Sequence, residues 1–190
     1  MKKTLSVVFA VIFAFSAFVS AHAALGLIPE DKVKGYVADY MGYDESKMSD
    51  YSQSKTTHNF LDYYNVSFKY DGVTFKVGID AASIVEEYSY NASKVIVPKK
   101  ESGIISEYDA KGYALKEASV SSSDAVFKSE TFRISGSVPS YSYNFLSKTA
   151  EWNVEVNGYT GSIIKSEHND QNVIMMFFIR LFAKIAALFV

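Results

Sequence analysis

Two histidines stand near carboxylates in the sequence, and they are the residues of this chain best suited to acid–base or metal chemistry. His58 precedes Asp62 by four residues, while His168 follows Glu167 and lies two residues before Asp170. An imidazole beside a carboxylate can act as a general base or bind a metal ion. The competing interpretation is a solvated loop residue in each case, which the small number of candidates favours.

Other catalytic signatures are missing from the sequence. It contains no cysteine, no HExxH motif and no GxSxG motif. The adjacent pairs Glu86-Glu87 and Glu30-Asp31 do not suit a two-carboxylate mechanism. Neighbours in a strand point to opposite faces, and acidic residues at a helix start interact favourably with the helix dipole. We therefore predict a binding protein that is not an enzyme and needs no cofactor or metal.

The first 23 residues have the pattern of a secretory signal peptide. Lys2 and Lys3 precede an apolar run, which ends before the small-residue motif Ala21-His22-Ala23. We expect an exported protein located in the periplasm, the cell envelope or outside the cell. Cleavage after Ala23 leaves 17 basic and 21 acidic residues. This negative balance argues against nucleic acid as a partner, because backbone binding needs clustered cations.

A repeated pattern at an offset of 77 residues divides the remaining chain. The segment KGYVADYM begins at Lys34, and KGYALKEA begins at Lys111. The same offset relates Tyr64 to Tyr141, Phe68 to Phe145, Phe75 to Trp152, Val77 to Val154 and Ile79 to Val156. We predict an α+β fold of two tandem units, each a helix packed on a small antiparallel sheet. The units span 29–90 and 105–168, and the linker spans 91–104.

The predicted helix of each unit has one apolar stripe. The stripe of the first helix consists of Val33, Tyr36, Val37, Tyr40 and Met41. The stripe of the second consists of Ala110, Tyr113, Ala114 and Ala118, after a capping box that begins at Ser106. Residues at such spacings lie on one side of a helix, so these side chains are expected to face the sheet.

A hairpin is predicted after each helix. Asp71-Gly72 favours a two-residue type I′ turn, and this turn sets the register of the flanking strands. The expected pairs are Tyr70 with Val73, Phe68 with Phe75, Val66 with Val77 and Tyr64 with Ile79. All four pairs lie on one face, which we expect to be buried. One further strand is expected in each of the ranges 45–60 and 122–137.

These hairpins resemble the PepSY domain, a family that includes propeptides of thermolysin-like peptidases. The similar segments are YNVSFKYDG, FKVGIDA and WNVEVNGYTGSII, with Thr160-Gly161 at the second turn. The range 82–85 departs from the family pattern because it lacks the glycine. The resemblance implies a protein that binds and restrains a peptidase, or regulates another envelope enzyme. The 14 tyrosines fit such a binding surface, or equally a strand core.

The range 173–190 differs from the rest, with 16 apolar residues among 18. It is predicted to be an apolar, basic helix at the membrane surface, because two internal cations disfavour a full span. The predicted membrane or partner contacts are Phe177, Phe178, Arg180, Phe182, Lys184 and Phe189. The alternative is a helix packed between the units or on a second copy. Through this helix the chain could instead serve as a membrane-associated structural protein of the envelope; its oligomeric state stays open.

Overall fold

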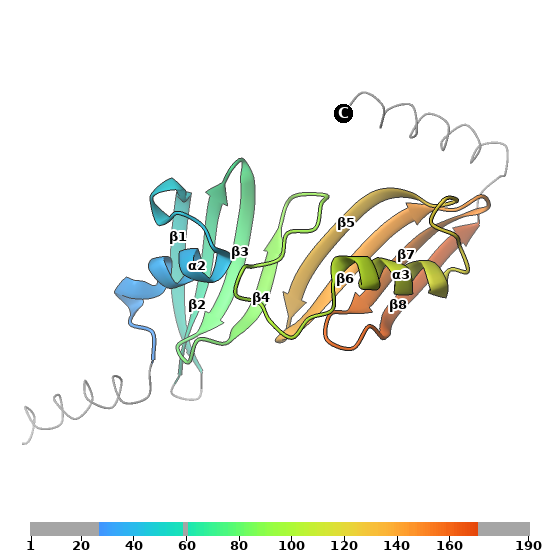
Figure 1. The fold of residues 1–190 in the computed structure, drawn as a ribbon. Helices are drawn as coiled ribbons and strands as arrows, with labels where there is room; N and C mark the ends of the chain where they lie inside the picture. Colours follow the sequence, from blue (N-terminus) through green and yellow to red (C-terminus); the bar gives the residue numbers. More distant parts are fainter. Residues whose placement is uncertain (1–26, 59–60, 171–190) are drawn as a thin grey trace, which may run out of the picture.

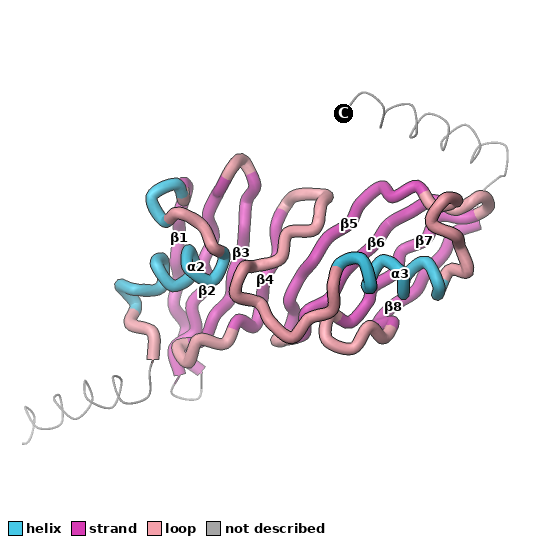
Figure 2. Tube along the Cα trace, in the orientation of Figure 1, coloured by secondary structure: helices cyan, strands magenta, loops and turns pink. Residues whose placement is uncertain are grey.

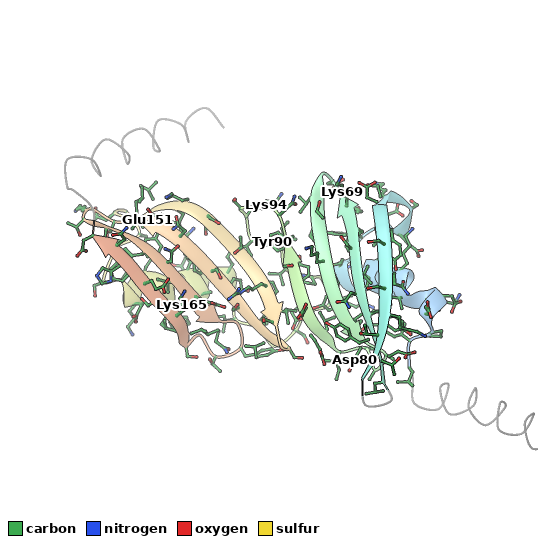
Figure 3. All side chains as sticks on the ribbon, turned by 180° about the vertical axis from the view of Figure 1, so that it is seen from behind. Lys69, Asp80, Tyr90, Lys94, Glu151 and Lys165 are labelled. Atoms are coloured by element: carbon green, nitrogen blue, oxygen red, sulfur yellow. The ribbon has the colours of Figure 1, made fainter. Side chains whose placement is uncertain are left out.

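The computed structural model describes residues 27–58 and 61–170, in which one antiparallel sheet of eight strands dominates (Figures 1 and 2). The strands follow chain order: β1 Ser49–His58, β2 Leu61–Tyr70, β3 Val73–Asp80, β4 Val85–Tyr90, β5 Val126–Ser135, β6 Val138–Leu146, β7 Ala150–Asn157 and β8 Ile163–Asp170. The helices are α2 Val33–Met41 and α3 Glu107–Glu117, with short 3-10 helices η1 Glu30–Lys32 and η2 Glu45–Lys47. Both α-helices lie on one face of the sheet, and the other face is free of helices (Figures 1 and 3).

The predicted fold class, two tandem units with separate small sheets, is wrong. Strand β4 pairs with β5 through Glu87 opposite Ser135 and Tyr88 opposite Ile134, so the sheet continues without a break. Strands β4 and β8 are not among the strands predicted from the sequence. Without β4, no strand was available to connect the predicted sheets. Both missing strands are rich in polar and charged residues, so they lack the alternation that identifies a half-buried strand.

The predicted hairpins are confirmed residue by residue. Strands β2 and β3 pair Phe68 with Phe75 and Val66 with Val77. Asp71 and Gly72 both have positive φ, as a type I′ turn requires. In the second hairpin the pairs expected from the offset of 77 residues are also present: Phe145 with Trp152, Tyr143 with Val154 and Tyr141 with Val156. The register therefore directs the apolar set of each hairpin to the helix-covered face.

The core lies between this face and the helices, and it is unusually rich in aromatic side chains. The largest fully buried ones are Tyr64, Tyr88, Tyr141, Tyr143, Phe68, Phe75, Phe132 and Phe145. Buried alanines allow α3 to lie close to the sheet, since Ala110 and Ala114 are both fully covered. Tyr113, predicted to belong to the same stripe, is 43% exposed, so its assignment to the core is wrong.

The tyrosine hydroxyls connect the sheet to the segments around the helices. Tyr64 donates to the carbonyl of Ile28 at 3.2 Å, and Tyr141 donates to the carbonyl of Ile105 at 2.9 Å. A buried hydroxyl needs such a partner, because its desolvation is otherwise uncompensated. The segments that precede the two helices are therefore fixed by hydrogen bonds as well as by packing.

Tyr90 occupies the junction of β4 with β5. Its hydroxyl accepts hydrogen bonds from the backbone N–H groups of Phe132 at 2.8 Å and Ile96 at 2.9 Å. It also donates to the carbonyl of Lys94 at 2.9 Å. One donor and two acceptor sites are the whole capacity of a hydroxyl. Tyr90, at the end of β4, thus connects β5 and the segment after β4 through hydrogen bonds to its hydroxyl.

We predict that Tyr90→Phe destabilises the protein by about 1–3 kcal/mol, because it leaves two backbone donors at the junction without their acceptor. The free energy of unfolding measured with urea tests this. Limited proteolysis of the native protein should also cleave the range 91–104 faster. Tyr108→Phe is the matched control, because Tyr108 is 86% exposed. Equal stability of the two variants would contradict the assigned role of Tyr90.

Candidate interaction surfaces

The structure does not assemble a site around His168. Its ring stacks on Trp152 with centroids 4.7 Å apart, and its Nε2 lies 3.9 Å from Asp170. Glu167 instead pairs with Lys165 at 3.0 Å. Neighbours in a strand point to opposite faces, so Glu167 and His168 diverge. The combination of these three groups, which the sequence analysis considered and disfavoured, is therefore not formed.

The second candidate pair is His58 with Asp62. The side chain of His58 lies outside the described part of the structure. Asp62 accepts hydrogen bonds from Thr57 Oγ1 at 2.7 Å and from Lys55 Nζ at 3.4 Å. Within residues 27–58 and 61–170, no three histidine or acidic side chains are grouped so as to hold a metal ion.

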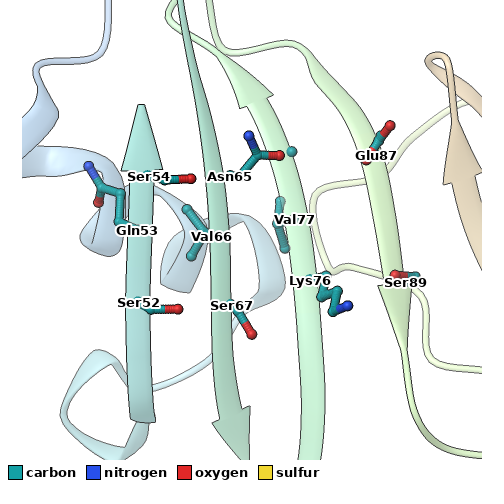
Figure 4. Close-up of a pocket in the computed structure, with 11 residues that line it drawn as sticks. Ser52, Gln53, Ser54, Asn65, Val66, Ser67, Lys76, Val77, Glu87 and Ser89 are labelled. Carbon is teal, nitrogen blue, oxygen red and sulfur yellow. The ribbon is translucent and has the colours of Figure 1, made fainter. Parts of the chain in front are cut away.

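The helix-free face of the sheet carries polar side chains in both of its halves (Figure 3). Two shallow grooves lie on it, with volumes of about 320 Å³ and 260 Å³. The first groove crosses β1 to β4 and is lined by Ser52, Gln53, Ser54, Asn65, Val66, Ser67, Lys76, Val77, Gly78, Glu87 and Ser89 (Figure 4). The second groove crosses β5 to β8 and is lined by Ser129, Thr131, Ser142, Tyr143, Asn144, Asn153, Val154, Glu155, Lys165 and Glu167.

The polar groups in and beside the second groove bind one another. Arg133 contacts Glu155 at 2.6 Å, and Lys128 contacts Glu151 at 2.6 Å. The amide of Asn144 also donates to Glu151 at 2.9 Å. Hydrogen bonds from Lys128 and Asn144 lower the pKa of Glu151. Burial alone would raise the pKa of Glu155, but the hydrogen bonds from Arg133 and Ser140 outweigh it and lower the pKa.

The first groove differs from the second in how its polar side chains are bonded. Of the eight polar side chains that line it, only Gln53 forms side-chain hydrogen bonds in the described part of the chain, and the other seven make no side-chain hydrogen bond or ion pair there. They are Ser52, Ser54, Asn65, Ser67, Lys76, Glu87 and Ser89. Lys76 and Glu87 supply one charge of each sign and extend from β3 and β4 in different directions (Figure 4). This groove therefore keeps its hydrogen-bonding capacity available at the surface.

Tyr63 lies at one end of the first groove. The tip of its side chain occupies the space above Gly78, where an added Cβ would lie only 1.9 Å from the phenolic oxygen. Gly78 is therefore needed for the close approach of this ring to the strand. Burial, together with the charges of Glu87, Glu86 and Asp80, raises the pKa of Tyr63 to about 12. The phenol consequently stays neutral and can both donate and accept hydrogen bonds at neutral pH.

The two edges of the sheet differ in how well they are covered. Beside β1, the carbonyl of Glu30 accepts from Gln53 Nε2 at 3.2 Å, and the Glu30 carboxylate pairs with Lys55 at 3.1 Å. Among the described strands, β8 pairs only with β7, and all its residues after Ile163 are exposed. An edge strand of this kind presents unpaired backbone groups to a partner.

Residues 104–167 match the model of the PepSY family, the peptidase propeptide and YPEB domain. The match covers α3 and most of β5 to β8 and does not extend to the first four strands. No curated protein matches the chain. A crystal structure of a candidate lipoprotein from Clostridium difficile 630 is 17% identical and aligns with 75% of this chain and 93% of its own. Its TM-score of 0.34 is too low to indicate a shared fold.

The predicted contacts of the C-terminal range lie outside the described residues. This applies to Phe177, Phe178, Arg180, Phe182, Lys184 and Phe189, and also to the predicted signal peptide 1–23. Among the helices that the structure describes, none is long and apolar enough to cross a membrane.

The ion pairs around the second groove predict a pH dependence of stability. The pKa values of Glu151 and Glu155 lie below the ordinary 4.5 in the folded protein, so the unfolded chain binds protons first as the pH falls. Their contribution is therefore present above the unfolded pKa and is lost as the pH falls through the folded values. The thermal midpoint of a Glu151→Gln/Glu155→Gln variant should vary less between about pH 6 and pH 3 than that of the parent. If the thermal midpoints of the variant and the parent depend on pH to the same extent, this assignment is contradicted.

Proposed function

We propose that this chain is an exported, non-catalytic regulatory protein that restrains a peptidase in the cell envelope. The observation that carries the proposal is the PepSY match over residues 104–167, since the family includes peptidase propeptides. The signal-like range 1–23 supports export. The sequence also lacks the HExxH and GxSxG motifs of common hydrolases.

The partner would bind by adding a strand to β8. This mode of recognition uses backbone hydrogen bonds for affinity, and side chains on alternate positions for selectivity. On the helix-free side, Lys165 and Glu167 would contact the added strand. On the other side, the stacked rings of Trp152 and His168 lie beside it. The β1 edge is less suitable because Glu30 binds both Gln53 and Lys55 there.

The second candidate function, a membrane-associated structural protein, is favoured by the composition of residues 173–190. Deletion of this range distinguishes the two candidates. Restraint of a peptidase through β8 requires the truncated protein to keep its inhibitory activity. Loss of membrane association, with no inhibition by either form, would instead support the structural role.

Proline substitutions at two neighbouring positions of β8 test the edge directly. In an antiparallel pair, the backbone groups of successive residues point alternately toward the partner strand and away from it. One of Ser166→Pro and Glu167→Pro therefore removes a hydrogen bond to β7, while the other removes only an outward donor. The variant with a near-normal thermal midpoint should inhibit peptidase activity in an envelope extract at least about tenfold less well than the parent.

Hydrolysis of a fluorogenic casein substrate, with and without the added chain, measures this inhibition. Tyr108→Phe serves as the control, because Tyr108 is exposed and belongs to α3 rather than to the edge. If the stable proline variant inhibits as well as the parent, docking at β8 is wrong. If neither the parent nor the control inhibits, the peptidase proposal itself fails.

A further inference from the structure

We infer that the first groove of the helix-free face, across β1 to β4, is a binding site for a neutral saccharide. This site lies outside residues 104–167, which match the PepSY model, and is separate from the edge strand proposed to hold a peptidase. It is built by short polar side chains on four neighbouring strands (Figure 4).

The unused hydrogen-bonding capacity of the groove is the first argument. Four serine hydroxyls and the amide of Asn65 line it, and none of these side chains is bonded within the described structure. Each hydroxyl can donate one hydrogen bond and accept two, and an amide can donate as well as accept. A ligand that is dense in hydroxyl groups matches this set, because each of its hydroxyls also donates and accepts.

The charge of the groove is the second argument. Lys76 and Glu87 are its only charged lining residues, and together they carry no net charge. A nucleic acid or another polyanion would require clustered cations, and a polycation would require clustered carboxylates. The balance favours a neutral ligand, whose hydroxyls can bind an ammonium and a carboxylate equally well.

Shape and surface polarity are the third argument. The groove has a volume of about 320 Å³, near the lower end of the roughly 300–1,000 Å³ that is typical of ligand sites. Apolar ligands need a mostly hydrophobic lining. Here the side chains of Val66 and Val77 are buried, while the serines stand at the surface. Tyr63, which lies over Gly78, supplies an aromatic ring at one end for the C–H groups of a sugar.

The second groove is an internal comparison for these arguments. It lies on the same face of the same sheet, but Glu155 already binds Arg133, and Lys165 already binds Glu167. A saccharide would have to displace these ion pairs to bind there. Binding should therefore be confined to the first groove, although both grooves are polar.

The test titrates the chain, with residues 1–23 removed, with cellohexaose, maltohexaose and chitohexaose, and records ¹H–¹⁵N spectra. At least one of these neutral hexasaccharides should shift the amide signals of β1 to β4. Ser67→Leu should weaken this binding about tenfold or more, because it removes a hydroxyl and blocks the groove. Ser142→Leu is the matched control, because Ser142 lines the second groove from β6. This substitution should change the affinity less than about twofold.

Three results would overturn the inference: no response to any of the three sugars, shifts confined to β5 to β8, or equal weakening by the two substitutions. The thermal midpoint of each variant confirms that it is folded. Both serines are half-buried strand residues, so leucine is tolerated at both positions to a similar degree. Failure here leaves the peptidase proposal intact, because the inhibition assay depends on β8 and uses no saccharide.

Discussion

The continuity of the sheet depends on the short contact between β4 and β5. Only two residue pairs join these strands, against eight pairs between β2 and β3. Tyr90 reinforces the contact, because its hydroxyl binds the backbone of Phe132 in β5 and that of Ile96 and Lys94 after β4. These bonds use all the donor and acceptor sites of the hydroxyl. Because β4 pairs with β5, the two grooves lie on the same face of one continuous sheet.

The same chemistry explains the high tyrosine content. Tyr64, Tyr88, Tyr141 and Tyr143 have buried rings, and each hydroxyl donates to a backbone carbonyl outside the sheet. A phenylalanine could fill the same volume, but it would remove the hydroxyl that donates to that carbonyl. Of the two interpretations of the tyrosines, a binding surface or a strand core, the strand core is confirmed for these four. The tyrosines of α3 differ from these four, since Tyr108 is 86% exposed and Tyr113 is 43% exposed.

Local signals in the sequence predicted the hairpins and helix starts well. Asp71-Gly72 determines a turn, and the alternation of Val66 and Phe68 with polar residues determines which face is buried. Ser106 caps α3 as its spacing predicts, by accepting from the N–H of Asp109. The pairing of β4 with β5 could not be predicted in this way. It joins Glu87 to Ser135, 48 positions further along the chain, and Tyr88 is the only buried residue of β4.

The candidate surfaces were less predictable than the fold, because they also depend on contacts between residues that are distant in the sequence. Alternation places Ser67 and Lys76 on the face away from the core, which the register confirms. Sequence alone does not tell whether such polar groups bind each other, because that depends on the reach of side chains from neighbouring strands. Arg133 reaches Glu155, whereas Lys76 and Glu87 form no ion pair within the described structure.

The positions of the two proposed sites have a mechanical consequence. The saccharide groove crosses β1 to β4, while the peptidase edge is β8 at the opposite end of the sheet (Figure 1). A strand added at β8 extends the sheet away from the groove and covers none of its lining residues. Both sites can therefore be occupied together. A continuous sheet, held at Tyr90, would then keep a restrained peptidase close to the saccharide that the same chain binds.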